Sequence, residues 1–148
     1  MTSDQRISDN EALLQEVARN TEVGKNALAQ LLPMAQDREF RARLLFQQKE
    51  YRRLNQQAHT ALAACGARAR GQSRMARAAV RMGIQAKARG DRSTRNLAQM
   101  LAEGANQGAM DVIKAQRDWP NASTGAKELA GELQRFEEES AQVLKGYL

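Results

Sequence analysis

The sequence contains few of the residues on which disulfide, zinc and β-sheet architectures depend. Cys65 is the single cysteine among 148 residues, so an intrachain disulfide and a zinc site built from several cysteines are both excluded. The two prolines, Pro33 and Pro120, are too few for a turn-rich β protein. We expect Cys65 to be a partly buried helix residue rather than a reactive thiol.

Aromatic side chains and long apolar runs are also scarce. Aromatic residues make up only 4% of the chain, so Leu, Ala, Val, Ile and Met have to fill the core. No stretch approaches the roughly 20 apolar residues that a membrane-spanning helix needs. Residues 1–6 lack the apolar core of a signal peptide. We therefore expect a cytoplasmic protein without a membrane span.

The charged residues are distributed unevenly along the chain. The formal net charge is +6, yet residues 38–95 hold fifteen Arg and Lys residues against three acidic ones. The two flanking segments together carry more acidic than basic residues. A basic centre between acidic ends favours either an acidic protein partner or self-association.

Helical spacing of apolar residues begins near the N-terminus. Ser8 and Glu11 form a capping box at which the first helix is expected to start, so residues 1–7 are predicted to be a disordered tail. Pro33 is expected to end this helix because its ring clashes with the preceding turn. The predicted inner face comprises Leu14, Val17, Thr21, Gly24, Leu28 and Leu31.

The second helix is predicted between Asp37, a suitable N-cap, and Gly66, which accepts the left-handed conformation that ends a helix. Its inner stripe comprises Phe40, Leu44, Gln47, Tyr51, Leu54, Ala58 and Leu62. After a loop over residues 67–72, a shorter basic helix is expected from Ser73 to about Arg89. Its apolar face comprises Met75, Ala79, Met82 and Ala86.

Gly90 and Asp91 are expected to break the pattern and to cap a further helix, which ends near Trp119. The inner face of that helix comprises Leu97, Leu101, Gly104, Gly108, Val112 and Ala115. Ser123 or Thr124 is predicted to cap the last helix. Its inner face comprises Leu129, Leu133, Phe136, Ser140, Val143 and Tyr147.

These elements predict a single all-α domain over residues 1–148. Four long helices with short loops favour an antiparallel four-helix bundle. The short basic helix then lies in the crossover between the second and third long helices. Glycines at positions 104 and 108 are expected to let helices approach closely, or to make room for Tyr51 or Phe136.

Five short motifs suggest a relationship to a known superfamily. They are residues 31–33 (LLP), 48–51 (QKEY), 91–94 (DRST), 103–108 (EGANQG) and 136–138 (FEE). With these motifs and its two helical hairpins, the chain resembles the ferritin-like superfamily, and in particular uncharacterised bacterial ferritin-like proteins of about this length. The resemblance implies a ferritin-like bundle and association through helix faces, which we expect to produce a homodimer.

The resemblance also implies where metal ligands would stand. Metal-binding members use a glutamate from each of two helices and Glu-x-x-His from each of the other two. Arg53 occupies the position where a histidine would follow Glu50, Ser140 does so after Glu137, and the single His59 faces the other way. We therefore expect no metal and no cofactor. Candidate ligands, if one were bound, are Glu16 or Glu22, Glu50, Glu103 and Glu137.

We expect the other polar features to be solvent-exposed or structural rather than catalytic. We expect at least two glutamates of residues 137–139 to be solvated, and His59 to lie at the surface. Glu50 and Arg53, three residues apart, are expected to form an ion pair. Residues 68–95 are strongly basic but lack the interleaved aromatic side chains on which nucleic-acid bases stack.

Three functional hypotheses follow. The leading one is a non-catalytic, ferritin-like structural or interaction module that self-associates and has no enzyme activity. The second is a divergent metal-carboxylate protein that binds iron or manganese. The third is a nucleic-acid binder, which would use Arg70, Arg74, Arg77 and Arg81 to contact phosphates or another anion.

Overall fold

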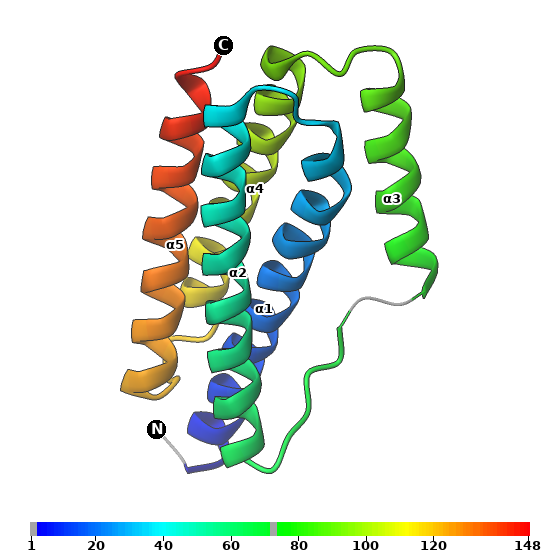
Figure 1. Ribbon diagram of the computed structural model, residues 1–148. Helices are drawn as coiled ribbons and strands as arrows, with labels where there is room; N and C mark the ends of the chain where they lie inside the picture. Colours follow the sequence, from blue (N-terminus) through cyan, green and yellow to red (C-terminus); the bar gives the residue numbers. More distant parts are fainter. Residues whose placement is uncertain (1–2, 72–73) are drawn as a thin grey trace.

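The computed structural model describes residues 3–71 and 74–148, and these residues form α-helices without any strand (Figure 1). The all-α prediction is therefore confirmed for the described part of the chain. The helices are α1 (Ser3–Leu31), α2 (Arg38–Ala64), α3 (Arg74–Arg89), α4 (Thr94–Asp118) and α5 (Thr124–Lys145). A short 3-10 turn, η1 (Leu32–Met34), follows α1.

The start of α1 differs from the sequence prediction. The helix begins at Ser3, so Ser8 and Glu11 lie inside it and do not form an N-terminal capping box. The predicted tail over residues 1–7 is wrong for residues 3–7, which are helical, while residues 1 and 2 lie outside the described part. Neither glycine nor proline occurs among residues 3–7, so nothing in this segment stops the helix from continuing.

The predicted junction between the first two helices is confirmed. α1 ends at Leu31, and Pro33 lies in the 3-10 turn that follows. The Asp37 side chain then caps α2, because its Oδ1 accepts a hydrogen bond of 2.8 Å from the backbone N–H of Phe40. All seven residues of the predicted inner stripe of α2 are buried.

The end of α2 confirms one prediction and corrects another. Gly66 follows the helix with a φ of +75°, a left-handed conformation that favours glycine. Cys65, which precedes it, is exposed rather than partly buried, because it lies past the last helical turn. Its sulfur accepts a hydrogen bond of 3.2 Å from the Asn10 side chain.

Serine side chains cap the last two helices. Ser93 caps α4 by accepting a hydrogen bond from the backbone N–H of Asn96, so the predicted cap at Asp91 is wrong. Asp91 instead accepts a hydrogen bond of 2.9 Å from the Ser93 N–H, and its contacts with Ser93 lower the pKa of its carboxyl. Ser123 caps α5, as predicted, and α4 ends directly before Trp119.

The core lies between four of the helices. α1 packs against α2, α4 and α5, while α5 packs against α4 and α2 (Figure 1). Their buried apolar side chains form one hydrophobic cluster that Leu and Ala dominate. On α5 the predicted inner face is partly wrong, because Val143 is 38% exposed and Leu144 is buried in its place.

Helix α3 stands beside α1, at the edge of the molecule (Figure 1). Among its described side chains only Ala88 is buried, and Ile84 packs against the core from a half-buried position. The predicted apolar face points to solvent: Met75 is 85% exposed and Met82 is 72% exposed. Within the described ranges, no helix combines the length and apolar character needed to cross a bilayer.

Candidate functional site

A cavity of about 350 Å³ lies between α1, α3 and α4. Its walls are mainly aliphatic, and α2 and α5 contribute the polar side chains of Gln47, Tyr51 and Glu137. The apolar lining includes Val23, Leu28, Leu31, Ile84, Met100 and Leu101. The cavity is open on one side, and α1, α3 and α4 add further polar groups at its border; a cleft with mainly aliphatic walls and some convergent polar groups is a common form of small-molecule site.

Two glycines shape this cavity by leaving room for side chains from other helices. A Cβ at Gly24 would lie only 2.5 Å from ring atoms Cε1 and Cζ of Tyr51. A Cβ at Gly108 would lie 2.7 Å from Cδ of Glu137. The room for Tyr51 is therefore made by Gly24, and not by Gly104 or Gly108 as the sequence suggested. A Cβ at Gly104 would have no neighbouring heavy atom within 4 Å.

Glu137 is the one carboxylate that reaches the cavity from the core side of α5. It is 2% exposed, and its Oε2 accepts a hydrogen bond of 2.9 Å from the Tyr51 hydroxyl. The other oxygen, Oε1, is buried and has no hydrogen-bond partner among the described residues. Glu138 and Glu139 are exposed, so the prediction that two of these three glutamates are solvated is confirmed.

Burial keeps this carboxyl largely protonated at neutral pH. Desolvation raises the pKa of Glu137 to about 8, although contacts with Tyr51 and Asn20 oppose the rise. The negative charges of Asp111 and Glu16 raise the pKa further. Burial, followed by the nearby Glu137, also raises the pKa of Tyr51 well above its usual value. Both groups of the pair are thus mainly neutral at pH 7.

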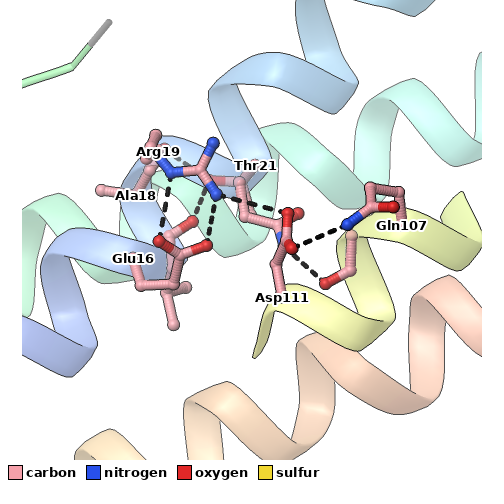
Figure 2. Close-up of polar contacts among 9 residues, drawn as sticks. Glu16, Ala18, Arg19, Thr21, Gln107 and Asp111 are labelled. Atoms are coloured by element: carbon pink, nitrogen blue, oxygen red, sulfur yellow. Dashed lines mark hydrogen bonds and ion pairs between the residues drawn. The ribbon is translucent and has the colours of Figure 1, made fainter. Parts of the chain in front are cut away.

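An ionic cluster borders the cavity where α1 meets α4 (Figure 2). Arg19 of α1 lies between Glu16, whose Oε2 accepts a 3.1 Å hydrogen bond from its Nε, and Asp111 of α4, which is 3.6 Å from its Nη2. Gln107 donates a 2.9 Å hydrogen bond to the same Asp111. The hydrogen bond to Glu16 contributes most to raising the pKa of Arg19.

The carboxylates that the resemblance nominated as metal ligands do not converge on one point, and Glu16, whose charge acts on Glu137, is paired with Arg19. Glu50 pairs with Arg53, Glu103 is exposed and accepts a hydrogen bond from Gln99, and Glu22 lies beside Gly71. Of the nominated carboxylates, Glu137 alone is among the residues that line the cavity. Across residues 3–71 and 74–148, no three His, Cys, Asp or Glu side chains are grouped closely enough to hold a metal ion. This donor set does not fit a dinuclear centre.

The Glu50–Arg53 ion pair is confirmed, with 3.0 Å between the guanidinium and the carboxylate. Arg53 also pairs with Glu132 of α5, so it joins α2 to α5. These side chains are partly exposed, and the pair is not a buried link in the core. The hydrogen bond to Glu50 is the main reason that the pKa of Arg53 is raised.

The remaining predicted contacts lie at the surface. His59 is exposed, as expected. Arg70 is 3.8 Å from Glu11, and its backbone N–H donates to the side chain of Gln15. Arg77 and Arg81 are exposed on α3, while the side chain of Arg74 lies outside the described residues.

The sequence did not predict that Tyr51 contacts both Glu137 and Gly24. One signal was present: Glu137 lies at helical spacing from Leu133 and Leu144, so it falls on the apolar stripe of α5. An acidic residue on such a stripe indicates a buried carboxyl. The prediction instead assigned Phe136 to that stripe, whereas Phe136 is half-buried and packs edge-on against Tyr51.

No protein-family model, curated protein or solved structure matches the chain. The ferritin-like resemblance therefore stays a prediction. What the site can do has to be inferred from its own geometry.

Proposed function

We propose that the protein is a non-catalytic helical module that binds a small, largely apolar molecule in the cavity between α1, α3 and α4. The observation that carries this proposal is the cavity itself, whose volume of about 350 Å³ falls within the range of small-molecule sites. Aliphatic side chains from three helices would take up the hydrocarbon surface of a ligand. The few polar groups would orient it.

The state of the polar pair argues against a general base and suits the binding of a ligand. A general base has to be ionised at the working pH, whereas Glu137 and Tyr51 are both largely neutral at pH 7 and are hydrogen-bonded to each other. Neutral donors and acceptors in a mainly aliphatic cavity are suited to recognising a ligand.

The binding can be tested with N-phenylnaphthylamine, a neutral apolar dye whose fluorescence rises in dry sites. Gly104→Leu places a leucine side chain in the open space beside the cavity. We expect this variant to bind the dye at least about tenfold more weakly than the unmodified protein. Gly131→Leu is the matched control, because Gly131 lies on α5 away from the cavity lining. Absence of dye binding to the unmodified protein would refute the proposal, as would equal binding by both variants.

We further propose that the helices form an antiparallel, ferritin-like four-helix bundle with α3 in the crossover. The pairing of α1 with α2 and of α4 with α5 supports two helical hairpins, because each pair is consecutive in the chain and packs together. The segment that joins the two pairs contains α3. An experimental structure tests this directly, and parallel α1 and α2 would overturn it.

Self-association as a homodimer also remains a proposal. The surface feature that favours it is an apolar pair on α2, where Leu45 is 51% exposed and Phe46 is 63% exposed. Light scattering at high protein concentration should give twice the mass of the chain, and Phe46→Ser should shift the protein towards monomer. A strict monomer at high concentration would dismiss self-association.

The nucleic-acid hypothesis retains one supporting observation, the exposed arginines 77 and 81 of α3. It predicts a gel shift with nucleic acid that weakens steeply as salt increases, and no shift at low salt would discard it. The metal-carboxylate hypothesis has no comparable support, because its candidate ligands do not converge on one point. Elemental analysis after expression with added iron and manganese tests it.

A further inference from the structure

The unpartnered oxygen of Glu137 indicates what the cavity is built to hold. Oε1 is almost wholly inaccessible and has no hydrogen-bond partner in the described part of the chain, and Glu137 is one of the residues that line the cavity. Leaving a buried polar atom unpaired costs free energy, so such atoms in native proteins call for an explanation. A ligand in the cavity that pairs with Oε1 would supply one.

The hydrogen bond from Tyr51 occupies Oε2 and leaves Oε1 available to carry the proton of the neutral carboxyl. The Tyr51 hydroxyl donates to Oε2, so Oε2 acts as an acceptor. We therefore assign the acid proton of the neutral carboxyl to Oε1. A protonated Oε1 is a hydrogen-bond donor, and it needs an acceptor atom on the ligand.

We propose, on the basis of the proposed binding function, that the ligand is a neutral, largely hydrocarbon molecule whose carbonyl or ether oxygen accepts a hydrogen bond from the Glu137 carboxyl. The hydrocarbon part lies against the aliphatic walls formed by α1, α3 and α4. A carbonyl or ether oxygen fits because it accepts a hydrogen bond and carries no charge.

The charges around Glu137 favour a neutral ligand over an ionic one. Glu16 of α1 and Asp111 of α4 raise its proton affinity, so the local potential opposes a second negative charge. The positive charge of Arg19 does not cancel this negative potential, because Arg19 is already paired with these two carboxylates. Lys87 of α3 lines the cavity and opposes a cation, while Tyr51 of α2 is neutral.

The preference can be measured by displacing N-phenylnaphthylamine with four molecules of the same chain length: methyl decanoate, decane, decylamine and decanoate. We expect methyl decanoate to bind at least about tenfold more tightly than decane at about pH 6. The preference should disappear at about pH 9.5, where Glu137, with a pKa of about 8, is ionised and cannot donate. Tighter binding of decylamine or decanoate than of the ester would overturn the proposal.

Two substitutions separate hydrogen bonding from packing. Glu137→Gln keeps a donor N–H that does not titrate, so it should retain the preference for the ester at both pH values. Glu137→Met removes the donor and should abolish the preference at both. If Glu137→Met fails to fold, as judged by circular dichroism, the different pH profiles of the unmodified protein and Glu137→Gln decide the matter. Identical profiles would overturn the proposal.

The two proposals fail in different ways. If the dye does not bind to the unmodified protein, the proposed function itself is wrong. If the dye binds and Gly104→Leu weakens it, but ester and decane compete equally at about pH 6, the cavity binds apolar molecules without using Glu137. That result would overturn only the inference about the ligand's oxygen.

Discussion

At the scale of single residues, Glu137 and Tyr51 show how a polar pair is held inside an aliphatic core. Each group is buried, and each is in its neutral form because ionisation in this environment is unfavourable. Gly24 leaves space for the Tyr51 ring, and Gly108 leaves space for the Glu137 carboxyl. Both polar groups can therefore occupy these positions only because the facing residues on other helices are glycines.

Glu137→Gln is expected to remove a pH dependence of stability. Folding raises the pKa of Glu137 from 4.5 to about 8, so the folded chain holds this proton more tightly than the unfolded chain does. The free energy of unfolding should therefore fall as pH rises through this window, by up to about 5 kcal/mol from this group. Urea denaturation of both proteins across the window measures the difference. If the free energies of unfolding of the two proteins change with pH in the same way, the pKa of Glu137 is not raised by burial.

Gly24→Ala is expected to destabilise the protein by about 1–3 kcal/mol, because the new Cβ would clash with the Tyr51 ring. The ring cannot move aside freely, since its centroid lies 4.9 Å from that of Phe136. Gly104→Ala is the matched control. Because position 104 is open and helical, this substitution should stabilise the protein by about 0.5–1 kcal/mol. Chemical denaturation measures both changes, and equal effects would show that Gly24 is not needed for space.

At the scale of elements, α3 differs from the other four helices. Its described side chains are mostly exposed, and it is attached to the rest of the molecule chiefly through Ile84 and Ala88. Because the cavity lies between α3, α1 and α4, this weakly packed helix covers one side of the candidate site. A local displacement of α3 would therefore widen this side of the site without opening the main core.

Amide hydrogens of α3 are expected to exchange much faster than those of α1, α2, α4 and α5. The reason is that few apolar contacts have to break for α3 to open locally. Hydrogen exchange followed by mass spectrometry measures this, and bound N-phenylnaphthylamine should slow exchange in α3 specifically. Protection of α3 equal to that of α1 would show that the helix is firmly docked.

At the scale of the whole molecule, one hydrophobic cluster joins the four long helices. Arg19 links α1 to α4 and Arg53 links α2 to α5 at the surface, but exposed ion pairs of this kind contribute little. The stability of the fold therefore resides in the shared apolar core. That core includes side chains from both halves of the chain.

Unfolding in urea is expected to be a single cooperative transition. Because the halves share one core, neither should unfold alone. Far-UV circular dichroism reports on the helices, and fluorescence of the single tryptophan, Trp119, reports on the junction between α4 and α5. The two signals should have the same midpoint. Separate midpoints would contradict the prediction of a single domain.

The sequence by itself determined most helix boundaries and the inner face of α2. Pro33, Asp37, Gly66 and Ser123 act on the backbone within one helical turn, so their effect can be predicted from neighbouring residues. The start of α1 escaped prediction, because a capping box inside a continuous helix looks the same in sequence as one at its end.

Only the tertiary structure decided which side chains meet. Whether Phe136 or Glu137 faces the core depends on the rotation of α5 about its axis, and one residue changes the facing direction by about 100°. The meeting of Gly24 with Tyr51 depends on the spacing of α1 and α2. The cavity lies where side chains of α1, α3 and α4 come together. Such relations join residues far apart in the chain, so local spacing can indicate that Glu137 is buried but not which side chains it meets.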